Sequence, residues 1–295
     1  MQAETRNVAA CVRRICIATL VVCALTPARG EAGEIDTEHL FGFTIGTDVG
    51  SVGEREIEAT TTARLAKRSG RYNAISQTLS AEFVPMENFR TEFGGAVVSH
   101  DIAGVSGFED RRQIAFGGFF ADLRYRLLDR ANSPFGLAVG AEPRWGRIED
   151  GSGARTSNYS VDFVVTADRE IVADRIVAAV NLLYQPETAR SKVTGTWSQE
   201  STAGVATALM ARLQSGVFLG AEARYLRRYD GAGLDTLAGQ AFFLGPTLYL
   251  KISKQAWMAA AWSAQIAGRS ATATGPLDFV NFERHQVRFL FGFNF

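Results

Sequence analysis

Three consecutive polar residues, Ser99, His100 and Asp101, are of the types that form a nucleophilic relay. In such a relay a histidine takes the proton of the serine, and a third group orients the histidine. The alternation around these residues predicts a strand, in which successive side chains point to opposite faces. The three side chains then cannot meet without a bulge, so we interpret them as polar residues where a strand meets a loop. We predict no catalytic residue and expect that the protein is not an enzyme.

Carboxylates are grouped in two polar stretches, with Asp230 and Asp235 around small residues and Glu109 beside Asp110. Calcium binds carboxylates grouped in this way, but in turns such groups usually contact only solvent. The Gly-Ser-Gly sequence at 151–153 is too short for a phosphate-binding loop, and no helix is predicted after it. We therefore expect no metal and no cofactor.

Pairs of opposite charge recur two residues apart, with Glu142 before Arg144 and Glu222 before Arg224. Because residues two apart lie on the same face of a strand, the members of each pair share a face. Such pairs can interlock across neighbouring strands and stiffen a wall, or they can create a field that orients a polar solute. The sequence favours neither interpretation over the other.

These charges lie in segments in which apolar residues recur at every second position, the period of a β-strand. In the last segment every second residue from Val287 to Phe295 is valine or phenylalanine, and of the residues between them only Leu290 is apolar. Short and long connections alternate between the segments, which predicts an up-and-down meander. The longer, Gly-rich connections are expected at 102–111, 148–156, 186–198, 230–238 and 268–282. Twelve strands are expected, centred near residues 61, 78, 95, 119, 140, 164, 181, 205, 222, 246, 262 and 289.

The apolar face of such a meander can turn inward, as in a soluble barrel, or outward to lipid, as in a membrane barrel. Segments of ten or more residues favour the membrane, since strands in soluble proteins average about 5–6 residues. Aromatic residues expected at strand ends, Trp145, Tyr184 and Tyr225, favour it too, because membrane barrels carry aromatic girdles. We predict an all-β fold, a transmembrane antiparallel up-and-down β-barrel of about twelve strands over residues 54–295. An even strand number places both termini on one side.

The first thirty residues have the order of a secretory signal peptide: arginines, the apolar run 15–25, and small residues before a cleavage site. We expect cleavage after Gly30, with cleavage after Ala32 as the alternative. All three cysteines lie in this segment, so the processed chain would have no disulfide. Residues 31–53 are then a periplasmic N-terminal arm or plug. Their segment 41–46 also alternates, but a thirteenth strand would break the even number.

Composition excludes several other classes of protein. With 21% charged and 46% hydrophobic residues, the chain is not disordered. The formal net charge of +0 lacks the basic excess that a nucleic-acid-binding protein needs, so no nucleic-acid partner is expected. No run of 18 apolar residues is present, which excludes a helical membrane protein.

The closing residues 288–295 resemble the terminal strand of Gram-negative outer-membrane β-barrels. This resemblance implies that Phe291, Phe293 and Phe295 form the signal read by the barrel-insertion machinery. The rest of the chain after residue 30, including 54–56, 135–137 and 220–225, resembles an uncharacterised alphaproteobacterial family of such barrels. The resemblance implies an outer-membrane location, with outer-membrane lipid around the barrel, and identifies no transported solute.

Our first hypothesis is a passive channel for small hydrophilic solutes, with diffusion along a lumen of mixed charge. The alternative is a structural or surface-interaction barrel, with an interior filled by salt bridges and functional extracellular loops. The residues expected to line the lumen are Arg90, Glu92, Asp122, Arg124, Arg126, Glu142, Arg144, Glu222, Arg224 and Arg288.

Overall fold

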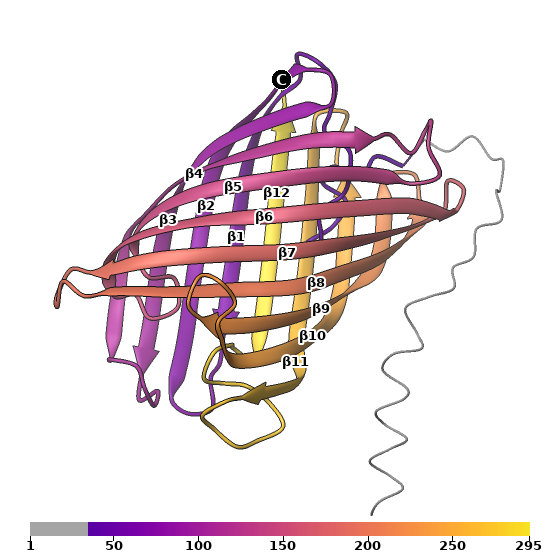
Figure 1. Ribbon diagram of the computed structural model, residues 1–295. Coiled ribbons are helices and arrows are strands. Elements are labelled where there is room, and N and C mark those ends of the chain that lie inside the picture. The colour runs from indigo at the N-terminus through magenta and orange to yellow at the C-terminus, as the bar shows by residue number, and fades with distance from the viewer. Residues whose placement is uncertain (1–34) are drawn as a thin grey trace, which may run out of the picture. The chain divides into compact units, whose positions relative to one another are not determined.

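The computed structural model describes residues 35–295, in which twelve antiparallel strands form one closed barrel (Figure 1). Each strand pairs with its neighbours in sequence, and β1 pairs with β12 from Glu56 opposite Asn294 to Leu65 opposite His285. The predicted all-β barrel and its strand number are confirmed. The predicted signal peptide lies outside the described residues. The strands are β1 (Arg55–Leu65), β2 (Arg71–Met86), β3 (Phe89–Ala103), β4 (Arg111–Leu128), β5 (Gly136–Ile148), β6 (Arg155–Val172), β7 (Ile176–Ser191), β8 (Trp197–Gln214), β9 (Val217–Asp230), β10 (Thr236–Lys251), β11 (Ala256–Ser270) and β12 (His285–Asn294).

The two ends of the barrel differ in their connections. We call the end at which β1 begins and β12 ends the terminal end, and the opposite end the loop end. Four of the five connections at the terminal end are tight turns, and the fifth, between β4 and β5, spans 129–135. Positive φ angles at Asn88 (64°), Asp174 (57°) and Gly216 (74°) allow the chain to reverse in three of the tight turns. The connections at the loop end span 66–70, 104–110, 149–154, 192–196, 231–235 and 271–284.

Most loops at the loop end are shorter than the sequence predicts, because the strands extend further. The largest difference is at 186–198, where β7 continues to Ser191 and β8 begins at Trp197. Outward residues such as Thr188 are polar there, so the apolar alternation stops while the backbone pairing between β7 and β8 continues. Tyr184 therefore lies in the middle of β7, and Tyr225 lies in the interior of β9, so the prediction that these two residues mark strand ends is wrong.

The apolar face of the sheet points outward. Leu79, Phe93 and Leu182 are exposed by 62%, 61% and 56%, whereas Asn181, the neighbour of Leu182, is fully buried. This is the arrangement in which the hydrophobic face contacts lipid and the polar face is enclosed. Within the described part of the chain, no helix is long and apolar enough to cross a membrane.

Candidate functional site

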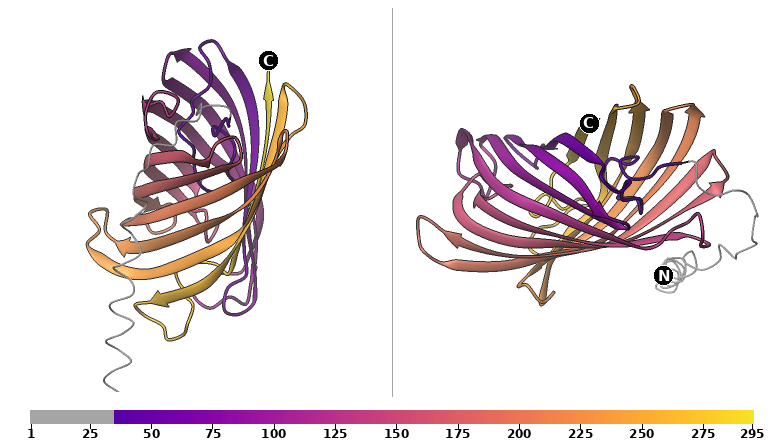
Figure 2. Two further views of the ribbon diagram at one scale, coloured as in Figure 1. Left: turned by 90° about the vertical axis from the view of Figure 1, so that its right-hand side faces the viewer. Right: turned by 90° about the horizontal axis from the view of Figure 1, so that it is seen from above.

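Residues 35–50, which we call the inner segment, lie inside the barrel toward its terminal end and contain no strand (Figure 2). Residues 41–46, the candidate thirteenth strand, are part of it. Three apolar side chains of the inner segment, Ile35, Leu40 and Phe41, are buried in a cluster on the inner wall. The wall is apolar rather than charged at this place, whereas the sequence predicts a lumen of mixed charge. The wall residues of the cluster are Val177, Ala179, Ala208, Met210 and Phe218.

Glu222 of β9 holds the middle of the inner segment. Its carboxylate accepts hydrogen bonds from three successive backbone N–H groups, Gly42 (2.7 Å), Phe43 (2.8 Å) and Thr44 (2.7 Å). Successive N–H groups that converge in this way form a concave anion site. The residue at 42 must be glycine, because a Cβ there would lie 2.2 Å from the Cβ of Ala261. One wall carboxylate thus satisfies three buried donors that pair with no strand.

Asp168 of β6 forms a second anchor with Arg130, which lies in the turn between β4 and β5. One oxygen of Asp168 accepts from the Thr47 hydroxyl (2.8 Å) and the Arg130 guanidinium (3.0 Å). The other oxygen accepts from the Thr47 N–H (2.8 Å) and the Thr37 hydroxyl (2.7 Å). Arg130 also donates to the Ile35 carbonyl and to Asp48 of the inner segment. Both ends of the inner segment are therefore tied to one buried ion pair.

Asn181 of β7 is the third anchor, since its side chain accepts from the Ile45 N–H (2.7 Å) and donates to the Ile45 carbonyl (2.8 Å). The sequence analysis did not select Asp168 or Asn181. The alternation along β6 would have predicted that Asp168 points inward, because Asp168 lies on the same face of β6 as the other inward residues. Nothing in the sequence indicates that these side chains bind a segment more than a hundred residues earlier in the chain.

Arg90 of β3 is the centre of a buried charge network at the terminal end. Its guanidinium lies 3.1 Å from Glu82, 3.5 Å from Glu92, 3.4 Å from Asp122 and 3.4 Å from Glu38. Arg124 forms a further ion pair with Asp122. Four of the predicted lumen residues, Arg90, Glu92, Asp122 and Arg124, are thus brought together.

The two acid–base pairs that recur in the sequence behave differently. Arg144 contacts Glu142 on its own strand and Asp162 on β6 (3.3 Å), which is the predicted interlocking across strands. Glu222 instead binds the inner segment, and the Arg224 guanidinium lies 3.7 Å from the centre of the Phe43 ring. The Glu222 and Arg224 side chains therefore both contact the inner segment.

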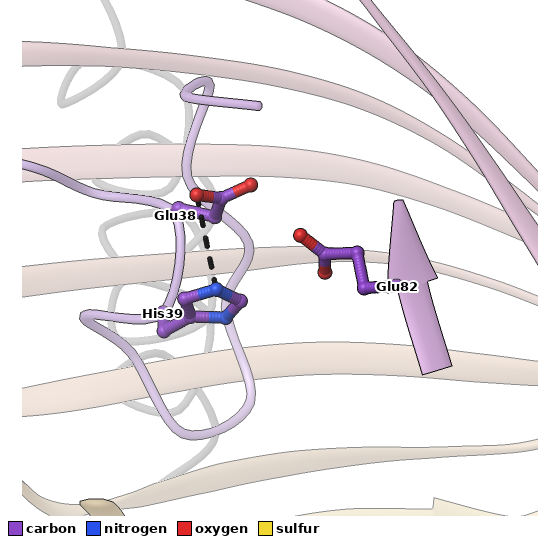
Figure 3. Close-up of side chains that lie close together, drawn as sticks. All are labelled: Glu38, His39 and Glu82. Atoms are coloured by element: carbon purple, nitrogen blue, oxygen red, sulfur yellow. Dashed lines mark ion pairs between the residues drawn. The ribbon is translucent and has the colours of Figure 1, made fainter. Parts of the chain in front are cut away.

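His39 of the inner segment is surrounded by carboxylates (Figure 3). Its Nε2 atom lies 3.8 Å from Glu38 and 3.5 Å from Glu56, and its Nδ1 atom lies 3.8 Å from Glu58. Burial, with the charge of Arg90, lowers the pKa of His39 well below its usual range. Burial and the neighbouring Glu82 raise the pKa of Glu38 well above its usual range. Among residues 35–295, two groups have the spacing to hold a metal ion: Glu38, His39 and Glu82, and His39, Glu56 and Glu58.

Toward the loop end the lumen is more open. The side chains of Arg144 and Asp162 are exposed by 40% and 34%, in contrast to Asp168, which is fully buried. Charged side chains on this part of the wall are therefore hydrated. We call this region the vestibule, lined by Arg64, Glu142, Arg144, Asp150 and Asp162.

Two loops bend inward over the vestibule. The β5–β6 loop contacts β2 and β3, since Gly151 accepts from the Tyr72 hydroxyl (2.9 Å) and the Asp150 carbonyl lies 3.0 Å from His100 Nε2. The β11–β12 loop binds its own flanking strand β11, where the Asp278 N–H donates to Gln265 (2.6 Å). The longest loop of the described chain therefore folds back onto the wall at the loop end.

The remaining residues singled out in the sequence occupy separate places. Arg126 binds Asn88 (3.0 Å) at the terminal end, and Arg288 is half-buried on the inner face of β12. His100 is buried at 1% exposure, whereas Asp101 pairs with Arg71 (2.9 Å), so the two do not form a relay. Phe291, Phe293 and Phe295 all point outward, with exposures of 38%, 43% and 65%.

A closed antiparallel barrel with an apolar outer face and a polar interior is the architecture of outer-membrane β-barrels. The chain belongs to a family of unknown function (DUF6662), whose sequence model matches residues 33–295. No curated protein matches the sequence.

Several solved structures are similar to this chain. The COG4313 outer membrane channel from Pseudomonas putida F1 has a TM-score of 0.55 and 12% identity, over 84% of this chain and 98% of that chain. The translocator domain of the autotransporter NalP from Neisseria meningitidis has a TM-score of 0.46 and 13% identity, over 84% of this chain and 91% of that domain. LpxR from Salmonella typhimurium has a TM-score of 0.46 and 10% identity, over 81% of this chain and 100% of that chain. At these identities the first similarity shows the fold alone, and the other two carry no argument.

Proposed function

We propose that the protein is an outer-membrane channel for small hydrophilic solutes, in which the inner segment closes the path at the terminal end. Short turns face the periplasm in barrels of this kind, so the terminal end would be periplasmic and the vestibule would open to the exterior. The similarity to an outer membrane channel is compatible with this role.

The observation that carries the proposal is the change in exposure along the lumen. Arg144 and Asp162 in the vestibule are exposed by 40% and 34%, whereas Glu222 under the inner segment is exposed by 1%. Charges that face a membrane-embedded interior are costly unless they are paired or hydrated, and hydrated ones mark a water-filled path. The path is therefore open from the loop end as far as the inner segment.

The inner segment is suited to act as a gate because side chains, not strand pairing, attach it to the wall. Glu222 accepts three of its backbone N–H groups, and Asp168 and Asn181 bind the residues that follow. Water can replace such hydrogen bonds one at a time, at a net cost of about 1.5–3 kcal/mol for each bond to a carboxylate and about 0.5–1.5 kcal/mol for each neutral bond. Displacing the segment does not require any barrel strand to separate.

One observation favours the alternative of a structural barrel, namely the charge network around Arg90, which fills part of the interior. That alternative assigns the function to extracellular loops. Five of the six loops at the loop end are short, and the longest, 271–284, bends inward onto the Gln265 side chain. Little loop surface then remains for a partner, so the channel is the better supported function.

Planar-bilayer recordings with the purified protein test the proposal. We expect brief conductance steps whose size depends on the salt concentration, as the inner segment leaves and returns. Folded protein that gives no steps at any voltage would contradict the channel and support the structural barrel.

A further inference from the structure

We propose that the lumen contains a binding site for one divalent transition-metal cation, formed by His39 and Glu38 of the inner segment with Glu82 of β2. The site would connect the inner segment to the barrel wall. It does not depend on whether the protein conducts solutes.

The donor atoms have the types and the spacing that such a cation needs. One nitrogen of His39 and one oxygen each of Glu38 and Glu82 all lie within 4.8 Å of one another (Figure 3). The Nε2 atom of His39 is 3.8 Å from Oε2 of Glu38. Ligands of a bound zinc ion lie about 2.0–2.2 Å from the metal, so small side-chain movements bring the three atoms to one centre.

The imidazole of His39 is already held in one orientation. The Trp257 ring stacks on it with centroids 4.2 Å apart and planes at 13°. The Nδ1 atom of His39 lies 3.8 Å from Glu58, whose other oxygen accepts from the Thr60 hydroxyl (2.6 Å). Histidine ligands of metals usually donate their second ring N–H to a carboxylate, which fixes the tautomer and leaves the other nitrogen free. At 3.8 Å the contact of Nδ1 with Glu58 is an ion-pair distance and not a hydrogen bond, and Nε2 is the nitrogen that lies toward Glu38.

Glu56 is an independent indication that a ligand belongs here. It is only 1% exposed, and its Oε2 atom accepts a hydrogen bond from the Trp257 indole (2.8 Å). Its Oε1 atom is buried without a hydrogen-bond partner and lies 3.5 Å from His39 Nε2. A buried carboxylate oxygen without a partner is costly, and a cation at His39 Nε2 would provide the missing partner.

The local charge also favours a cation. Six carboxylates surround this part of the lumen, against the guanidiniums of Arg90 and Arg124, and Arg288, whose charge reaches Glu58. With all of them ionised, six negative and three positive charges leave an excess of three negative charges. The carboxylates are Glu38, Glu56, Glu58, Glu82, Glu92 and Asp122.

The imidazole decides the class of metal. Calcium and magnesium prefer sites made of oxygen atoms alone, whereas imidazole suits zinc, copper, iron and nickel. One histidine with two or three carboxylates is therefore a site for zinc or a similar ion. Zinc is the probe we choose, because it has no redox chemistry.

The test is zinc binding by the purified full-length barrel after treatment with a chelator, measured by isothermal titration and by metal analysis. We expect one zinc ion per chain, loss of that ion in His39→Gln, and clearly weaker binding in Glu82→Gln. Glu187→Gln is the matched control, because it makes the same change at a half-buried lumen carboxylate that has no histidine beside it. Far-UV circular dichroism shows whether each variant keeps its strands.

Two results would overturn the site: folded protein that binds no zinc, or His39→Gln that binds as much zinc as the unchanged chain. Binding of calcium without zinc would overturn it too, because it would show a site of oxygen atoms without the imidazole. If His39→Gln does not fold, Glu56→Gln replaces it, since glutamine can still accept the Trp257 hydrogen bond. That variant is expected to bind zinc at least about tenfold more weakly, and unchanged affinity would contradict the role of the unpartnered oxygen.

Discussion

Glu222 in the barrel wall and Thr44 in the inner segment are joined by two hydrogen bonds to the same carboxylate oxygen. The Thr44 N–H donates over 2.7 Å and its hydroxyl over 3.0 Å. This wall charge therefore has a specific partner within the chain. The wall is complementary to the inner segment along its length, as the contacts of Asp168 and Asn181 also show.

Replacing Arg130 by alanine should release the inner segment. The change leaves the buried carboxylate of Asp168 without its cation, and removing one partner of a buried ion pair costs about 3–5 kcal/mol. Hydrogen exchange at the Thr47 amide, which donates to Asp168, should therefore become much faster. Arg175→Ala, at an exposed position in the next turn, is the control. Equal protection of Thr47 in both variants would show that Arg130 does not hold the segment.

An arginine at Leu182 should destabilise the barrel strongly in a lipid bilayer. Leu182 is exposed by 56% on the outer face, six residues from the start of β7 at Ile176. With about 2.5 Å of height per residue in a tilted strand, it lies near the middle of an apolar band about 25 Å tall. Leu182→Arg should cost about 2–4 kcal/mol of unfolding free energy.

The matched control for that change is Thr188→Arg, on the same face of β7 beyond the apolar band. Thr188→Arg should cost only about 0–1 kcal/mol of unfolding free energy. Denaturant unfolding in phospholipid vesicles gives both values. Equal costs at the two positions would contradict the placement of this face in lipid.

Removing the last aromatic side chain should impair assembly in cells. Phe295 is exposed by 65% at the end of the chain, where no packing accounts for it. If it is read by the insertion machinery, Phe295→Ala lowers the amount of folded protein in the outer membrane while refolding into detergent stays unchanged. Phe135→Ala removes another exposed ring (39%) outside the last strand and should lower neither. Equal outer-membrane amounts in the two variants would contradict a signal at Phe295.

The barrel could be predicted because its pattern is repeated in every strand. Leu182 outside and Asn181 inside illustrate the rule that fixed the face of each strand. The ends of the strands were harder to predict from the sequence, because apolar alternation indicates contact with lipid and not backbone pairing. Beyond Tyr184 the strand β7 continues with polar residues outside, so it was interpreted as a loop.

The inner segment could not be placed from the sequence, although residues 31–53 were expected to be an arm or plug. Its contacts join residues far apart, such as Thr44 and Glu222, which are separated by 178 positions. Periodicity describes one strand and its neighbours and contains no information about such pairs. For the same reason His39 was not considered as a ligand, because its carboxylate neighbours Glu56 and Glu82 come from two different strands.

The most direct measurement of the central claim compares single-channel recordings of the unchanged chain and Glu222→Gln. Glutamine keeps the shape but loses the charge that holds three N–H groups, and each hydrogen bond to a charged group is worth about 1.5–3 kcal/mol. A loss of about 1.4 kcal/mol in the free energy that holds the segment changes the equilibrium constant between closed and open states tenfold. The open fraction should therefore rise at least about tenfold. Glu187→Gln should leave it unchanged. Identical recordings from folded Glu222→Gln and the unchanged chain would contradict the inner segment as the gate.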